Sequence, residues 1–85
     1  MLRIQIQVVD GRVVRLYSGG LTADTTHIYT YKEALGRLRD TYSTWELLVP
    51  RIIAYLIDHY PSEDWCIQVL NDGVELRRFE LRSNH

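Results

Sequence analysis

The sequence predicts an α+β fold in which two terminal β-hairpins form one antiparallel sheet and two central helices pack on one of its faces. Three observations support this prediction. Strand-like runs lie at both ends of the chain, and each is interrupted by a turn signal, Asp10-Gly11 in the first and Asn71-Asp72-Gly73 in the second. Between these runs the apolar residues change to helical spacing. Because strands and helices are segregated, the order β-β-(β)-α-α-β-β favours antiparallel pairing over alternating parallel β-α-β units.

The first hairpin is expected within residues 2–17. Its first strand alternates apolar and polar side chains, the pattern of a half-buried strand, with apolar positions at Leu2, Ile4, Ile6 and Val8. A three-residue loop ending at Gly11 would place Ile6 opposite Val14 on one apolar face. A two-residue loop would place Ile6 opposite Arg15 and mix the two faces. We therefore expect the three-residue loop.

The segment after this hairpin predicts a loop, a short strand and a helix. Residues 18–24 are rich in turn-forming residues, and the β-branched and aromatic residues at 26–30 indicate a short additional strand. Thr30 and Glu33 have the spacing of a capping box, which marks a helix start. Apolar residues follow at helical intervals, so we expect the first helix to span residues 31–42.

The next apolar stripe is unusually wide and predicts a second helix, with members at Trp45, Leu48, Val49, Ile52, Ile53, Leu56 and Tyr60. Pro50 inside a helix would remove one backbone hydrogen bond and clash with the preceding turn, at a cost of about 3 kcal/mol. We therefore expect a break, with a short turn at 44–48 and a fresh helix over 50–60. Tyr55 and Ile57 flank the stripe, so the helix lies either in the middle of the core or half in a partner.

The second hairpin is expected to turn at residues 71–73. Its last strand changes phase, because Leu76 lies on an even position and Phe79 on an odd one, which predicts a β-bulge at Arg77-Arg78. The hairpins and helices together predict a core made of Ile4, Ile6, Val14, Leu16, Leu35, Leu38, Ile52, Leu56, Ile67, Val69 and Leu76.

Size and charge restrict the classes of protein that fit. Eighty-five residues suffice for one domain, expected over residues 1–85. Ten basic against eleven acidic residues give a formal charge of −1, which provides no long-range field toward nucleic acid or anionic membranes. Cys66 is the single cysteine, the longest apolar run is far shorter than the roughly 20 residues of a membrane span, and no leader follows Met1. We therefore expect a cytoplasmic protein without membrane association.

The sequence offers little for catalysis. His27, His59 and Cys66 are the candidate ligands or nucleophiles, but they lack the spacing of a metal site. His59 near the end of the second helix is explained by the helix dipole, and Cys66 by packing as a small hydrophobic residue. Gly19-Gly20 lacks the lysine and the helix start of a phosphate loop. We expect no enzymatic activity, no metal and no cofactor.

Aromatic residues and arginines provide the strongest functional signal. The chain has two tryptophans, six tyrosines and one phenylalanine, and all of its ten basic residues except Lys32 are arginines. Tyrosine, tryptophan and arginine are enriched at protein interfaces. We expect partner-binding residues on both hairpins and on the second helix, at Arg15, Tyr17, Tyr55, Arg77 and Arg78.

Our leading hypothesis is a small protein-interaction module: a regulator, adaptor or inhibitor that covers a surface of a larger protein. Short occluding proteins of this kind are typical of phages and mobile elements. We also expect the chain to form a homodimer, either through the stripe of the second helix or through edge pairing of a hairpin. The alternative is a nucleic-acid-binding domain, since arginines interleaved with aromatic residues on a sheet face are one way to bind a single strand.

Overall fold

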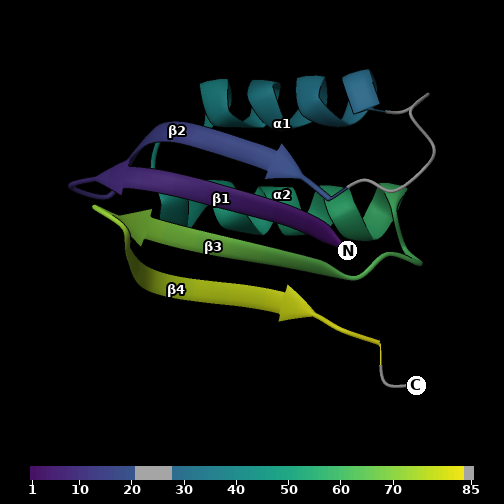
Figure 1. Cartoon of the computed structure of the whole chain (residues 1–85). Coiled ribbons are helices and arrows are strands. Elements are labelled where there is room, and N and C mark those ends of the chain that lie inside the picture. Colours follow the sequence, from purple (N-terminus) through teal and green to yellow (C-terminus); the bar gives the residue numbers. More distant parts are fainter. Residues whose placement is uncertain (21–27, 84–85) are drawn as a thin grey trace.

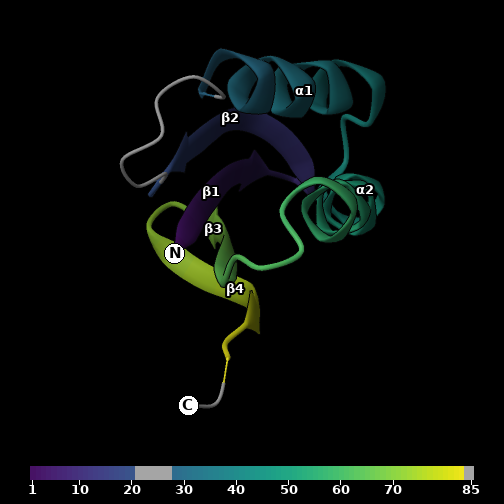
Figure 2. The same cartoon turned by 90° about the vertical axis from the view of Figure 1, so that its right-hand side faces the viewer.

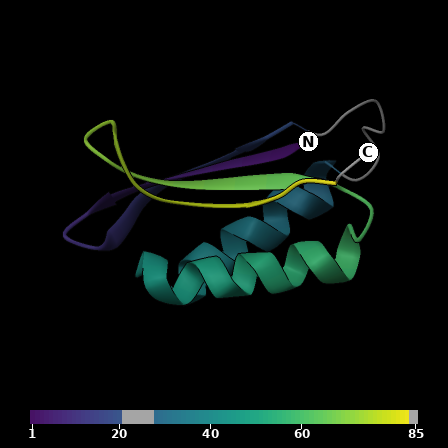
Figure 3. The ribbon, with the colours of Figure 1, turned by 90° about the horizontal axis from the view of Figure 1, so that it is seen from below.

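A computed structural model describes residues 1–20 and 28–83 and confirms the predicted order of elements (Figure 1). Two strands, two helices and two further strands follow one another along the chain: β1 (Leu2–Val9), β2 (Arg12–Gly19), α1 (Ile28–Thr41), α2 (Trp45–His59), β3 (Trp65–Asn71) and β4 (Val74–Leu81). Both hairpins belong to a single sheet, and both helices pack on the same face of it (Figure 3). Within the described residues, no helix is long and apolar enough to cross a membrane.

The sheet has the strand order β2-β1-β3-β4, and its central pair, β1 with β3, is parallel, so the sheet is mixed and the prediction of antiparallel pairing is wrong for this pair. Pairing within each hairpin is antiparallel as expected. The parallel pair follows from the path of the chain, because each element reverses the direction of the one before it and β1 and β3 are the first and fifth elements (Figure 1). β2 and the two helices thus form the long connection between these parallel strands.

The hairpin turns differ from the prediction in length. Both loops have two residues: Val9 pairs with Arg12, Asn71 pairs with Val74, and each Asp-Gly pair has positive φ at both positions, as a type I′ turn requires. The three-residue loop predicted for the first hairpin is therefore wrong. With a two-residue loop alone, apolar residues would pair with polar ones across the hairpin. A β-bulge just after each turn shifts the register by one residue and returns the apolar residues to one face.

The bulges also correct two members of the predicted core. The extra residues that they insert are Val14 in β2 and Leu76 in β4, and these side chains are 59% and 45% exposed. Seven of the other predicted members are buried, while Leu16 and Leu38 are half-buried. The predicted bulge at Arg77-Arg78 is displaced toward the turn, because the shift occurs opposite Val69 and Leu70. The core also includes Leu2, Val8, Tyr31, Leu48, Val49 and Trp65, which the prediction omitted.

Helix α1 begins three residues earlier than predicted. Residues 28–30 belong to the helix, so the short strand predicted at 26–30 is wrong over that part, while Thr26 and His27 lie outside the described residues. Within α1, Tyr31 and Leu35 lie one helical turn apart, and both are fully buried. This buried pair anchors the first half of α1 to the core.

Helix α2 is continuous through Pro50, contrary to the predicted break. Its first turn forms ahead of the proline, because the Leu48 backbone N–H donates to the Thr44 carbonyl at 2.9 Å. Leu48, Val49, Ile52 and Leu56 are buried on both sides of Pro50. Burying four aliphatic side chains contributes roughly 1.5–3 kcal/mol each, which outweighs the cost of about 3 kcal/mol for an internal proline.

Candidate functional site

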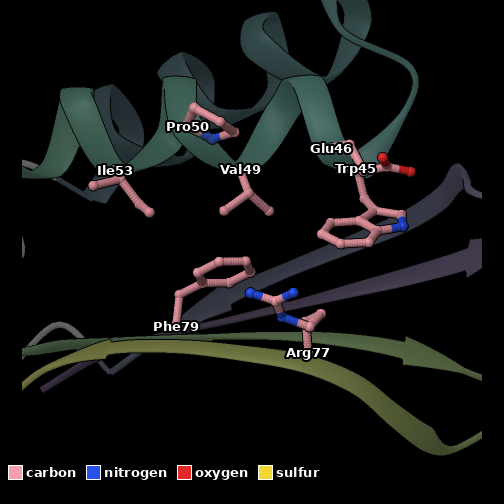
Figure 4. A pocket seen from close by; sticks show the side chains of 7 residues that line it. All are labelled: Trp45, Glu46, Val49, Pro50, Ile53, Arg77 and Phe79. Carbon is pink, nitrogen blue, oxygen red and sulfur yellow. The ribbon is translucent and has the colours of Figure 1, made fainter.

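The structure contains an apolar groove where its own helices leave the sheet uncovered. Helix α1 lies on the β2 side, α2 lies level with β1 and β3, and within the described chain no helix lies over β4 (Figure 2). The groove between α2 and β4 has a volume of about 440 Å³ and is lined by Trp45, Glu46, Val49, Pro50, Ile53, Arg77 and Phe79. Figure 4 shows Trp45 and Val49 of α2 extending toward Phe79 and Arg77, which rise from β4.

Two aromatic rings form the apolar part of the groove together with the aliphatic residues of α2. Trp45 and Phe79 lie with their ring centroids 6.5 Å apart, and both are half-buried. Trp45 is held at the start of α2, where its backbone N–H donates to the Gly11 carbonyl at 3.1 Å. Phe79 pairs with the fully buried Ile67 on β3, so its ring rises on the helix-bearing face of the sheet. Aromatic rings fixed in this way present apolar area to a ligand at little cost in conformational entropy.

Arg77 supplies a positive charge inside this apolar groove. Its guanidinium carbon lies 5.2 Å from the centroid of the Phe79 ring, a cation–π contact. Among the described residues, neither Arg77 nor Glu46, which also lines the groove, forms an ion pair. The groove therefore combines apolar walls with one cationic and one anionic side chain whose charges are available to a ligand.

The opposite face of the sheet is polar and internally paired. The Gln5 amide donates to Gln68 at 3.2 Å, and Gln68 donates to Glu75 at 3.1 Å. The Arg78 Nε donates to the same carboxylate at 2.8 Å. The hydrogen bonds from Arg78 and Gln68 lower the pKa of Glu75, because both favour the charged carboxylate. This face thus satisfies much of its own hydrogen bonding.

The structure does not bring the five predicted partner-binding residues together. Arg77 lies in the groove, whereas Arg78, the next residue of β4, points to the opposite face and pairs with Glu75. Arg15 and Tyr17 lie on that opposite face in β2, across from Gln7 and Gln5. Tyr55 lies on α2, where its ring stacks on His59 at 4.4 Å and contacts Tyr60.

Sequence reasoning missed the two aromatic residues of the groove, Trp45 and Phe79, as a site. Trp45 is assigned by its spacing to the stripe of the second helix and Phe79 to the apolar face of the last strand. Both assignments place the side chain on the correct face of its element, because both side chains lie between helix and sheet. The signal that could have found the site is the number of helices: when one helix packs on the β2 side and the other over β1 and β3, two helices leave β4 uncovered.

The described residues contain no group of three His, Cys, Asp or Glu side chains that could hold a metal ion. Cys66 is buried on the polar face of the sheet, at a small hollow that is also lined by Arg3, Arg78 and Arg82. His59 is half exposed and lies 3.4 Å from Asp58, at the end of α2. His27 lies outside the described residues.

A tyrosine cluster lies where the first turn of α1 meets the end of α2, and there the ring of Tyr31 packs edge-on against that of Tyr60, with centroids 5.7 Å apart. Burial, reinforced by the neighbouring tyrosines, raises the pKa of Tyr31 and raises the pKa of Tyr55 to about 12. The fold thus favours the neutral phenols. Their contribution to stability is complete below the ordinary pKa of 10.0 and is lost as the pH rises from 10 through the folded-state values.

We predict that Tyr31→Phe reduces this alkaline loss of stability. The Tyr31 hydroxyl is buried and has no hydrogen-bond partner among the described residues, so its removal should raise the free energy of unfolding at pH 7 by roughly 1 kcal/mol or leave it unchanged. Urea unfolding at pH 7 and pH 11 measures both effects. If the variant and the wild type lose the same free energy of unfolding between pH 7 and pH 11, ionisation of Tyr31 is not the cause of the alkaline loss of stability.

Comparison of the chain with models of protein families, with curated proteins and with solved structures gave no match. Its function therefore has to be inferred from the chain's own geometry.

Proposed function

We propose that this chain is a small, non-enzymatic protein-interaction module that binds an apolar segment of a partner protein in the groove between α2 and β4. The observation that supports the proposal is an apolar groove with two aromatic walls and, at its floor, the guanidinium of Arg77, which has no carboxylate partner among the described residues. Aromatic and arginine anchors in a concave site are the features that dominate binding energy at protein interfaces. Binding there would cover a surface of the partner, as expected of a regulator, adaptor or inhibitor.

The dimensions of the groove favour a helical ligand. On α2 its lining extends from Trp45 to Ile53, which at 1.5 Å per residue is about 12 Å, or two helical turns. An amphipathic helix that occupies this length would contribute apolar side chains at i, i+3 or i+4, and i+7. A carboxylate near one end of that helix would pair with Arg77, because an arginine beside an aromatic ring still offers its planar donors to a carboxylate.

The alternative function is nucleic-acid binding by the polar face of the sheet. Two arginines of that face, Arg78 and Arg82, lie beside the carboxylates of Glu75 and Glu80 at 2.8 and 3.4 Å. These pairs reduce the positive charge that would attract phosphates, and the whole chain has a formal charge of −1. The geometry thus supports a protein ligand better, and one experiment distinguishes the two functions.

We predict that a charge reversal in the groove, Arg77→Glu, abolishes capture of the partner, whereas the same reversal on the opposite face, Arg15→Glu, does not. The immobilised full chain is exposed to nuclease-treated and untreated lysate of the cells that produce it, and captured proteins are identified by mass spectrometry. Both arginines are exposed, so neither change should unfold the domain. With the purified partner, Arg77→Glu should weaken binding by at least about 30-fold, the effect of losing more than 2 kcal/mol at an interface anchor.

Intrinsic fluorescence provides an independent readout of the same binding. Of the two tryptophans, Trp65 is buried in the core and Trp45 lines the groove, so a bound segment should change the emission of Trp45. A ligand that is lost after nuclease treatment, that depends on Arg15, and whose log affinity falls steeply with log salt would contradict the proposal and support nucleic-acid binding. Equal capture by Arg77→Glu and the wild type would also contradict it.

A further inference from the structure

The outer side of β4 is an open edge of the sheet. Strand β4 is last in the order β2-β1-β3-β4, and none of the described residues pairs with its outer side. At the other edge, the connection between the helices protects the start of β2, because Val13 donates its backbone N–H to Ser43 at 2.8 Å and Arg12 forms a bridge with Thr44. Unpaired backbone groups along an edge strand can pair with a second chain.

β4 has four charged side chains and one bulge, two of the devices that can block such pairing, but neither interrupts the backbone edge over residues 77–81. The strand has eight residues with neither proline nor lysine, and its bulge lies at the turn end, which leaves residues 77–81 in regular pairing with β3. Three of its aliphatic side chains, Val74, Leu76 and Leu81, are between 45% and 64% exposed. The regular part of the edge is therefore long enough for antiparallel pairing with another strand.

The sequence of this segment is complementary to itself in one register. Residues that face each other in an antiparallel pair lie on the same side of the sheet, and in β4 Arg77, Phe79 and Leu81 share the helix-bearing side while Arg78 and Glu80 share the other. If Phe79 lies opposite Phe79 of a second copy, each Arg78 faces a Glu80. Within one chain Arg78 already pairs with Glu75 at 2.8 Å and Glu80 lies 3.4 Å from Arg82, so the contact between copies would extend these two pairs into one charge network. Two opposite-charge pairs then flank one aromatic pair, and both kinds of cross-strand pair are favourable.

The neighbouring registers that keep the faces aligned are unfavourable. A shift toward the turn places Arg78 opposite Arg78 of the second copy, and a shift away from it places Glu80 opposite Glu80. Like charges directly opposite one another destabilise a strand pair. Charge complementarity therefore selects a single two-fold arrangement centred on Phe79.

We infer that this chain forms a symmetric homodimer in which the β4 strands of two copies pair antiparallel about Phe79, which makes one continuous eight-stranded sheet. The pairing uses the same patch on both copies, as an isologous interface requires. Because Phe79 also lines the groove, the two grooves of the dimer would lie next to each other on the helix-bearing side. This inference does not depend on what the groove binds.

Complementary charge reversals test the arrangement. In the single variants Arg78→Glu and Glu80→Arg, the two facing positions carry like charges, so each should raise the dimer dissociation constant at least about tenfold. A mixture of the two single variants should form heterodimers, because the two glutamates of one chain would then face the two arginines of the other. The double variant R78E/E80R restores opposite charges across the interface within one sequence and should dimerise more tightly than either single variant, although it loses the pairs that Arg78 and Glu80 form with Glu75 and Arg82 in their own chain.

Sedimentation equilibrium at several protein and salt concentrations measures these constants, and circular dichroism verifies that each variant is folded. The charge reversal Arg15→Glu on β2 is the matched control and should not change the dissociation constant. A wild-type chain that stays monomeric up to millimolar concentration would overturn the inference. So would a dimer that both single variants leave intact, or a mixture of single variants that stays monomeric.

Discussion

Truncation of Leu56 to alanine should lower the free energy of unfolding by roughly 2–5 kcal/mol. The side chain is fully buried on α2, within the core cluster that joins both helices to the inner face of the sheet. Its removal loses the burial of the aliphatic group and leaves a cavity that the neighbouring strands cannot fill. Because a typical domain has only about 5–15 kcal/mol of stability and small domains have less, this variant should be close to unfolding.

The adjacent residue provides a matched control for this prediction. Ile57 is 54% exposed, so Ile57→Ala removes an aliphatic group of the same size from the same helix at little cost. Urea unfolding followed by circular dichroism measures both variants. If the Leu56 variant loses less than about 1 kcal/mol, that side chain contributes much less to the core than its burial indicates.

Substitution of Gly20 by alanine should cost a similar amount for a different reason. The φ of Gly20 is +81°, where an L-residue is strained by about 1–2 kcal/mol. The added Cβ would also overlap the Met1 backbone carbonyl and lie 3.1 Å from the Arg3 nitrogen, at the start of the central strand β1. Relief requires a backbone shift beside Leu2, which is fully buried, so we expect a total loss of roughly 2–5 kcal/mol.

Two other glycines serve as controls that separate the cost of backbone strain from the cost of the steric overlap. Gly11 has a φ of +77° but open space around a Cβ, so Gly11→Ala should show the backbone strain alone. Gly36 lies within α1, also with open space, so Gly36→Ala should stabilise the domain by roughly 0.5–1 kcal/mol. Thermal unfolding of the three variants should rank them Gly36→Ala, Gly11→Ala, Gly20→Ala from most to least stable. A Gly20 variant as stable as the Gly11 variant would contradict the predicted overlap.

The sequence was sufficient to predict the element order and the positions of both turns, because these depend on local patterns. Alternation identified β1, and the Asp-Gly pairs identified the turns. Loop length and bulge position could not be predicted in the same way. A three-residue loop and a two-residue loop followed by a bulge both align the apolar residues, and the difference decides whether Val14 and Leu76 are buried.

Tertiary packing explains the errors in the helices and the missed site. Local chemistry predicts a break at Pro50, but burial of Val49 and Ile52 on either side of it keeps α2 continuous. The groove depends on where α2 lies over the sheet, which no local pattern specifies. Consequently Trp45 and Phe79 could be assigned to their elements from the sequence, but their meeting at 6.5 Å could not.

The parallel pairing of β1 with β3 determines how long part of the core stays exposed while the chain is being synthesised. Partners in these strands, such as Gln5 and Gln68, are 63 residues apart, so at roughly 5–20 residues per second the ribosome needs about 3–13 s to supply β3 after β1. During that time the first hairpin can close, but β1 lacks its parallel neighbour β3, and the two helices that cover its helix-bearing side are made only after β2. The nascent chain therefore exposes Leu2, Ile4, Ile6 and Val8 for seconds, which is the interval in which a chaperone would be of most use to it.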